Sequence, residues 1–169
     1  MSLELAKKAV DFFLNEEPRF DSVVWDFIGG EPTLEIALLD EISDYIKLRM
    51  YELNHPWFEN YMFSISTNGI LYDTPAFQNY IRKNHDHLSI GITIDGTKEK
   101  HDMHRVDLYG NGSYDRVAKN IALWQEQFPN ATTKVTFSSQ DLPLLKESII
   151  HLWEMGLKIV PANLVFEDV

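Results

Sequence analysis

The stretch SVVWDFIGGEP, residues 22–32, is the part of the chain that indicates its fold most directly. Residues 22–28 form a short, mostly apolar run that is typical of a strand buried on both faces. Gly29 and Gly30 end the run, because glycine allows the backbone to turn with positive φ. Glu31 adds a carboxylate directly after the turn, and Pro32 stiffens the exit. A buried strand with such an ending favours a parallel sheet that carries polar groups at its strand ends.

Helical and strand-like periods alternate along the chain on both sides of this segment. Helices are expected at residues 4–15, 33–53, 75–84, 114–128 and 141–156, and strands at 22–28, 61–66, 88–94, 133–138 and 158–166. Residues 97–112 read as a polar loop, after which Ser113 caps a helix. The connections between strands are too long for hairpins, so we expect right-handed crossovers and a parallel sheet. An open doubly wound sheet and a partial (β/α) barrel both satisfy this pattern.

Composition narrows the class of protein. The 169 residues are 44% hydrophobic, which is enough for one buried core and predicts a single domain over residues 1–169. No apolar run approaches the roughly 18 residues of a membrane span. The net charge of −11 disfavours a nucleic-acid partner. The first residues lack the order of a secretion signal, so a cytoplasmic protein is expected, and Met1, Ser2 and Leu3 resemble residues added for expression.

The chain contains no cysteine, which excludes disulfides, thiolate zinc sites and iron-sulfur ligation by these residues. His101 and His104 have the spacing of a metal-binding pair, but further ligands are not evident, so no metal site is predicted. A triad of Ser66, His101 and Asp95 lacks the nucleophile elbow of hydrolases. Dinucleotide and P-loop phosphate motifs are also missing from the sequence.

The loops that follow the predicted strands are polar and distinctive. They read GGEP at 29–32, STNG at 66–69, TIDG at 93–96 and SSQ at 138–140. Each sequence alone is typical of an ordinary turn. In parallel α/β architectures, however, the loops after the carboxyl ends of the strands lie together and hold the working groups. The sequence therefore predicts a site at this edge of the sheet.

Taken together and in this order, the loops resemble those of radical S-adenosylmethionine (radical SAM) enzymes. WDFIGGEP at 25–32 resembles the second strand of these enzymes with its Gly-Gly-Glu-Pro motif, and STNG at 66–69 resembles the end of the third. TIDG at 93–96, followed by His101, Asp102 and Arg105 and then by SYD at 113–115, is similar to the fourth-strand region of the branch that modifies peptides and proteins. This branch includes the anaerobic sulfatase-maturating enzymes. The resemblance covers about residues 20–168.

The resemblance implies an α/β fold, an incomplete parallel (β/α) barrel that is part of a radical SAM (β/α)6 core. It also implies a peptide or protein substrate and reductive cleavage of S-adenosylmethionine, whose methionyl and ribose groups would lie at the strand ends. By position, Gly29, Gly30 and Glu31 would receive the methionyl amino group, and Arg105 the carboxylate or ribose side. Thr93 stands where a serine is commoner in these enzymes. The cofactor-binding residues so implied are Gly29, Gly30, Glu31, Asn68, Thr93, Asp95 and Arg105.

One departure from the resemblance concerns the 4Fe-4S cluster, whose Cys-x-x-x-Cys-x-x-Cys loop is expected before residues 4–15. We therefore expect a truncated fragment that is inactive by itself, with its catalytic residues unassigned. A non-catalytic binding module on the same barrel, or an unrelated α/β hydrolase, are the alternatives. Loss of the first strand would leave residues 22–28 at a sheet edge, which predicts self-association through that strand.

Overall fold

The computed structural model describes residues 1–16, 20–129 and 132–165, and it confirms the alternation of helices and strands. The elements are α1 (Leu3–Asn15), β1 (Val23–Phe27), α2 (Ile36–Glu52), β2 (Tyr61–Thr67), α3 (Pro75–Asn84), β3 (Leu88–Ile92), α4 (Lys98–His104), α5 (Tyr114–Gln127), β4 (Val135–Phe137), α6 (Leu145–Glu154) and β5 (Ala162–Leu164). A 3-10 turn, Pro32–Glu35, precedes α2. The second helix, predicted to end at residue 53, ends one residue earlier at Glu52, and residue 166, the predicted end of the last strand, lies outside the described residues.

The strands pair in chain order, as the crossover rule predicts. β1, β2 and β3 form one sheet, and β4 pairs with β5 in parallel. β1 runs parallel to β2 in a register that sets Val23 opposite Tyr61. Thr93, which directly follows the end of β3 at Ile92, forms an isolated parallel bridge with Lys134, which directly precedes β4. The predicted strands at 88–94, 133–138 and 158–166 are therefore shorter in the structure than the sequence pattern indicates.

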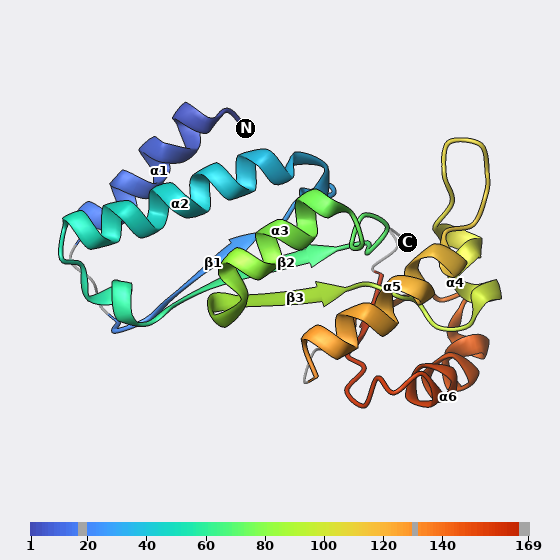
Figure 1. Cartoon of the computed structure of the whole chain (residues 1–169). Coiled ribbons are helices and arrows are strands. Elements are labelled where there is room, and N and C mark those ends of the chain that lie inside the picture. Colours follow the sequence, from blue (N-terminus) through green and yellow to red (C-terminus); the bar gives the residue numbers. More distant parts are fainter. Residues whose placement is uncertain (17–19, 130–131, 166–169) are drawn as a thin grey trace. The chain divides into compact units, whose positions relative to one another are not determined.

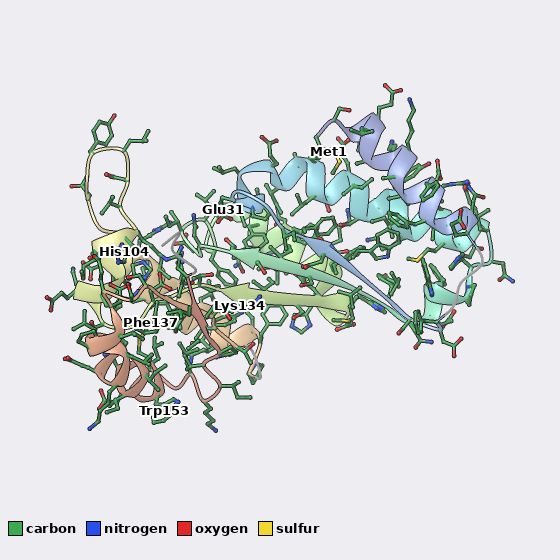
Figure 2. All side chains as sticks on the ribbon, turned by 180° about the vertical axis from the view of Figure 1, so that it is seen from behind. Met1, Glu31, His104, Lys134, Phe137 and Trp153 are labelled. Atoms are coloured by element: carbon green, nitrogen blue, oxygen red, sulfur yellow. The ribbon has the colours of Figure 1, made fainter. Side chains whose placement is uncertain are left out.

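The chain divides into two compact units. The first contains residues 1–65 and 74–89. In it α1 and α2 lie side by side, and α2 and α3 cover one face of β1 and β2 (Figures 1 and 2). The apolar stripe of α1 places Ala6, Val10 and Leu14 in the core, where β2 contributes Phe63 and Ile65. Ser2 begins α1 by accepting a hydrogen bond from the Leu5 amide at 3.3 Å.

The second unit contains residues 66–73 and 90–169, and its core is centred on α5. Val117, Ile121 and Trp124 form the buried stripe of that helix, and the Trp124 indole donates to the Ile90 carbonyl at 3.1 Å. The helix α6 ends at Glu154, and Gly156, which was predicted to stop it, follows the capping residue with a φ of +85°. Trp153 on the same helix is 57% exposed (Figure 2).

The predicted loop at 97–112 contains a helix. Thr97 accepts a hydrogen bond from the Lys100 amide at 3.3 Å and so begins α4, which has too few residues to show an apolar period. Residues 106–112 follow as a projecting loop, closed by an antiparallel bridge between Val106 and Gly112 (Figure 1). Ser113 precedes α5 but makes no side-chain cap; its hydroxyl instead bonds to His101 Nε2 and to the Arg105 carbonyl. Within the described ranges, no helix is long and apolar enough to cross a membrane.

Candidate functional site

The turn after β1 presents bare backbone. Gly29 and Gly30 have φ of +99° and +56°, which only glycine adopts readily. A Cβ atom built on either glycine would meet no atom within 4 Å, so the space beside both residues is open. The turn therefore leaves peptide groups accessible to a ligand, as the sequence predicts for this loop.

Glu31 is anchored by the turn that it begins. Its Oε1 atom accepts hydrogen bonds from the Thr33 amide at 3.1 Å and from the Thr33 hydroxyl at 2.5 Å. The carboxylate thus caps the 3-10 turn before α2, a position in which the helix dipole also favours negative charge. Gly29, Gly30 and Glu31 belong to the first compact unit, whereas the other predicted site residues belong to the second.

Asn68 and Thr93 lie at the ends of neighbouring strands. The Asn68 side chain accepts a hydrogen bond from the Ile70 amide at 2.9 Å and so shapes the turn. Gly69 is required there, because its φ is +76° and a Cβ atom would lie 2.6 Å from Ile92 Cγ2. The Thr93 amide donates to the Thr67 carbonyl at 3.0 Å. The Thr93 hydroxyl has no hydrogen bond among the described residues and is available to a ligand.

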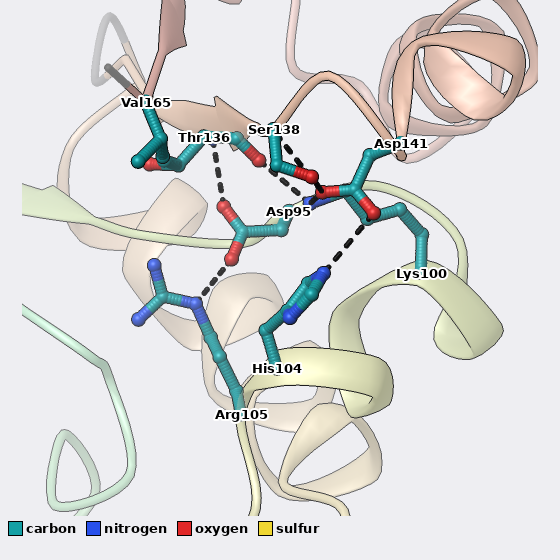
Figure 3. A pocket seen from close by; sticks show the side chains of 8 residues that line it. All are labelled: Asp95, Lys100, His104, Arg105, Thr136, Ser138, Asp141 and Val165. Carbon is teal, nitrogen blue, oxygen red and sulfur yellow. Dashed lines mark hydrogen bonds and ion pairs between the residues drawn. The ribbon is translucent and has the colours of Figure 1, made fainter. Parts of the chain in front are cut away.

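Asp95 and Arg105 form an ion pair at the edge of a cavity (Figure 3). Asp95 is only 3% exposed, and its Oδ2 atom accepts from Arg105 Nε. Its Oδ1 atom accepts from the Thr136 amide at 2.9 Å. Both carboxylate oxygens of Asp95 are therefore engaged within the protein. The Nη groups of Arg105, in contrast, make no hydrogen bond or ion pair with any described residue, so they can bind a ligand carboxylate.

His101 holds the loop between Asp95 and Arg105. It is fully buried, and its Nδ1 atom accepts from the Asp95 amide at 3.2 Å. The proton must then be on Nε2, which donates to the Ser113 hydroxyl at 3.0 Å; Ser113 in turn donates to the Arg105 carbonyl. Burial lowers the pKa of His101, which keeps the ring neutral. Both ring nitrogens are engaged, so His101 forms neither the metal pair with His104 nor the triad with Ser66.

Two further charged residues, Lys100 and Asp141, are buried beside Asp95 and Arg105, and the sequence pattern did not indicate a role for them. Lys100 is 1% exposed, and its Nζ atom donates to the Thr136 carbonyl at 2.6 Å and lies 3.4 Å from Asp141 Oδ2. Asp141 also accepts from the amide and hydroxyl of Ser138 and from His104 Nε2 at 3.0 Å. The spacing of Ser138 and Asp141 suits such a local turn, but nothing in the sequence marks Lys100 as buried.

Asp141 is held as an anion. Burial alone would raise the pKa of this carboxyl. The hydrogen bonds from His104 and Ser138, together with the charge of Lys100, outweigh burial and lower the pKa below its ordinary value. The Lys100 ammonium also lies 4.7 Å from the centre of the Phe137 ring, so the buried cation has three kinds of partner.

Two cavities meet at His104 and Arg105. One, of about 390 Å³, is lined by Asp95, Lys100, His104, Arg105, Thr136, Ser138, Asp141 and Val165 (Figure 3). The other, of about 410 Å³, is lined by Asn68, Ile70, His104, Arg105, Val106, Asp107, Asn111, Gly112, Ser113 and Arg116. The structure thus brings Asn68, Asp95 and Arg105 to the walls of adjoining cavities, while Thr93 is not part of either lining. A ligand bound here would meet the free end of Arg105.

Comparison with known proteins gives relatives of one kind. No protein-family model matches the chain. The chain is 32% identical over 124 residues to a cysteine-type anaerobic sulfatase-maturating enzyme of Clostridium novyi, over 73% of this chain and 30% of the relative. It is 29% identical over 168 residues to the uncharacterized protein MJ0907 of Methanocaldococcus jannaschii, over 98% of this chain and 53% of the relative. It therefore spans about half, or less, of the length of these curated relatives.

Solved structures show the fold. Native anSMEcpe with bound AdoMet superposes with a TM-score of 0.84 at 21% identity, over 99% of this chain and 43% of that chain. The same protein with bound AdoMet and the Kp18Cys peptide gives a TM-score of 0.82. The resemblance inferred from the strand-end motifs is confirmed, since the chain is related in sequence to anaerobic sulfatase-maturating enzymes of the radical SAM branch. The predicted fold, part of a radical SAM barrel, is confirmed as well.

Proposed function

We propose, from this relationship, that the chain provides the S-adenosylmethionine-binding part of a radical SAM enzyme that modifies a peptide or protein. The cavity edge at Arg105 carries the proposal: Asp95 holds Nε of the guanidinium, and the Nη groups have no partner among the described residues. Such a group suits the carboxylate of a zwitterionic ligand. The relatives that carry bound AdoMet and a peptide support both the cofactor and the class of substrate.

The predicted site residues take separate roles in this proposal. The open peptide groups of Gly29 and Gly30, with Glu31 beside them, would receive the methionyl amino group, and the free hydroxyl of Thr93 would contact the cofactor. Asn68 would line the same site. Asp95, whose oxygens are both engaged, would act by orienting Arg105 rather than by touching the ligand. We propose that residues 1–169 belong to a single barrel domain.

The iron-sulfur cluster of these enzymes does not fit the residues present, because the chain contains no cysteine to ligate iron. The cluster supplies the electron that cleaves S-adenosylmethionine to a 5′-deoxyadenosyl radical. We therefore expect that these residues alone bind the cofactor weakly and do not cleave it. Anaerobic reconstitution with iron and sulfide should give no cluster absorbance, and formation of a stoichiometric cluster would contradict the proposal.

Calorimetric titration with S-adenosylmethionine tests the binding site. The substitution Arg105→Ala should weaken binding by about tenfold or more, since a charged hydrogen bond contributes about 1.5–3 kcal/mol. Arg82→Ala is a matched control, because Arg82 lies on α3 and bonds only to Asn79 among the described residues. Equal affinity of the wild-type chain and Arg105→Ala would show that the ligand binds elsewhere.

A further inference from the structure

Among the described residues, Thr136 of strand β4 has no backbone hydrogen-bond partner on one side. On its other side β4 pairs with β5: the Val135 amide donates to the Pro161 carbonyl at 3.0 Å, and the Val165 amide to the Phe137 carbonyl at 2.7 Å. The peptide groups of Thr136 point away from β5, because alternate residues of a parallel strand bond to opposite neighbours. They would be unsatisfied next to β3, whose ladder ends at the bridge of Thr93 with Lys134.

Two side chains take the place of the missing strand at this point. The Asp95 carboxylate accepts from the Thr136 amide at 2.9 Å, and the Lys100 ammonium donates to the Thr136 carbonyl at 2.6 Å (Figure 3). Both the backbone donor and the backbone acceptor of Thr136, which belong to the two peptide groups that flank its Cα atom, are thus satisfied by the segment that follows β3. Because a buried peptide group rarely lacks partners, these side chains fix how α4 lies against β4.

The burial of Lys100 indicates a specific role for its charge. Its side chain is 1% exposed, whereas Lys98 on the same helix is 56% exposed and pairs with Asp115 at the surface. A buried ammonium costs free energy unless it is paired and hydrogen-bonded, and an apolar side chain would fill the same space without that cost. An apolar side chain could make neither the hydrogen bond to the Thr136 carbonyl nor the ion pair with Asp141 that the ammonium makes here.

We propose that Lys100 is a positioning residue for Arg105. It fixes the Thr136 carbonyl and so restrains the backbone of this residue, whose amide holds one oxygen of Asp95, so that the other oxygen of Asp95 faces Arg105 Nε. The Nη groups of Arg105 are thereby directed away from Asp95. Asp141 balances the charge of Lys100 and does not contact Arg105 in the described structure. The statement that Arg105 receives the carboxylate of S-adenosylmethionine rests on the proposed function. The statement that Lys100 positions Arg105 is independent of it.

Three variants separate positioning from simple support of the fold. Lys100→Met removes the ammonium and leaves the buried Asp141 carboxylate without this cation, with Ser138 and His104 as its remaining partners among the described residues. The double variant Lys100→Met with Asp141→Asn removes both charges and retains an acceptor for Ser138. Lys98→Met, on the same helix, removes an exposed lysine and is the matched control. Thermal unfolding reports stability, and the solvent exchange rate of the Arg105 Nε–H, measured by ¹⁵N NMR, reports how firmly Asp95 holds the guanidinium.

The positioning role predicts that stability and exchange respond differently. Lys100→Met should unfold at lower temperature, and the double variant should recover most of that loss. The Arg105 Nε–H should exchange about tenfold faster in both, the change expected when a net hydrogen bond is lost. Lys98→Met should match the wild type in both measurements. Wild-type exchange in the double variant, or a double variant no more stable than Lys100→Met, would overturn the inference.

Titration of the same variants with S-adenosylmethionine separates this inference from the proposed function. Where the wild-type chain binds the cofactor, the double variant should bind it about tenfold more weakly, in step with the faster exchange. A wild-type chain that binds no S-adenosylmethionine, but whose Arg105 exchange responds to Lys100 as predicted, would contradict the proposed function alone. Unchanged affinity together with unchanged exchange in the double variant would contradict the positioning role alone.

Discussion

His101 is a neutral histidine whose two nitrogens are both committed. In the unfolded chain its pKa has the ordinary value of 6.5, and burial lowers it in the folded chain. The unfolded state therefore binds more protons as the pH falls, so the stability contributed by neutral His101 is complete above pH 6.5 and is lost below it. Asp95, Arg105, Asp102 and Lys100 also influence this pKa, but their effects are smaller than that of burial.

We predict that His101→Asn reduces the fall in melting temperature between pH 7.5 and pH 5.5. Asparagine retains an acceptor for the Asp95 amide near the position of Nδ1 but does not titrate. The pKa of His55 is also lowered by burial, so His55 contributes to the fall in melting temperature in both proteins. The comparison is therefore between the two falls in melting temperature and not between the melting temperatures themselves. An equal fall in the variant and the wild type would mean that His101 is not the titrating group.

Asp141 loses its contribution to stability at a lower pH than His101 does. Its folded pKa is lowered from 3.8, so its contribution to stability is complete above that pH and is lost as the pH falls toward the folded pKa. We predict that Asp141→Asn costs about 3–5 kcal/mol at pH 7, because Lys100 is then a buried cation without its anion. Urea unfolding measures this cost. Asp115→Asn, at the exposed partner of Lys98, should cost less than about 1 kcal/mol.

The turn between β3 and α4 is packed directly against α6. Gly96 has a φ of +114°, and a Cβ atom there would lie 2.2 Å from Ser148 Cβ. We predict that Gly96→Ala destabilises the protein by more than about 2 kcal/mol, because backbone strain adds to overpacking. Gly30→Ala, at a φ of +56° but in open space, should cost about 1 kcal/mol. Chemical denaturation of both variants tests the difference, and equal costs would show that α6 moves aside.

Local signals in the sequence were sufficient for some elements and insufficient for others. Gly29, Gly30 and Gly156 could be placed at turns because positive φ is a property of the residue itself. The helix α4 was missed because its cap, Thr97, is a common loop residue and its seven residues have no apolar stripe. The buried position of Lys100 could not be predicted either, since it depends on Thr136 and Asp141, which the fold brings close from far along the chain.

The motif residues illustrate the same distinction at the site. Their order along the chain resembles that of radical SAM enzymes, and the barrel was implied by that resemblance; strand alternation alone predicted only that the loops share one edge of a parallel sheet. The separate roles of these residues, however, could be assigned only from the positions of their atoms. Asp95 was expected to line the ligand cavity; it lines the cavity beside Arg105, where both of its oxygens are used to hold Arg105 and Thr136. A sequence pattern records which residues are present and not which atoms are already bonded.

The edge of the described sheet at β1 predicts the association state of the chain. β1 pairs only with β2 among the described strands, and Val24 on it is 62% exposed. We predict concentration-dependent self-association in sedimentation experiments, and we expect Val24→Lys to weaken it, because an edge lysine opposes strand pairing. Ile159→Lys replaces an apolar residue with the same exposure outside the strands and is the control. A monomer at all concentrations would show that this edge does not attract a second chain.

The side-chain ligation of Thr136 also has a genetic consequence. Ordinary strand pairing uses backbone atoms and therefore tolerates almost any mutation that preserves the pleat. Between β3 and β4, in contrast, the pairing is encoded at positions 95 and 100, where one codon change removes a donor or an acceptor. Position 136 itself is free to drift to any residue except proline, which has no N–H to offer Asp95. Natural variation should accordingly be wide at position 136 and narrow at positions 95 and 100. Ordinarily a strand position such as 136 is expected to vary less than positions in a loop or a short helix, such as 95 and 100.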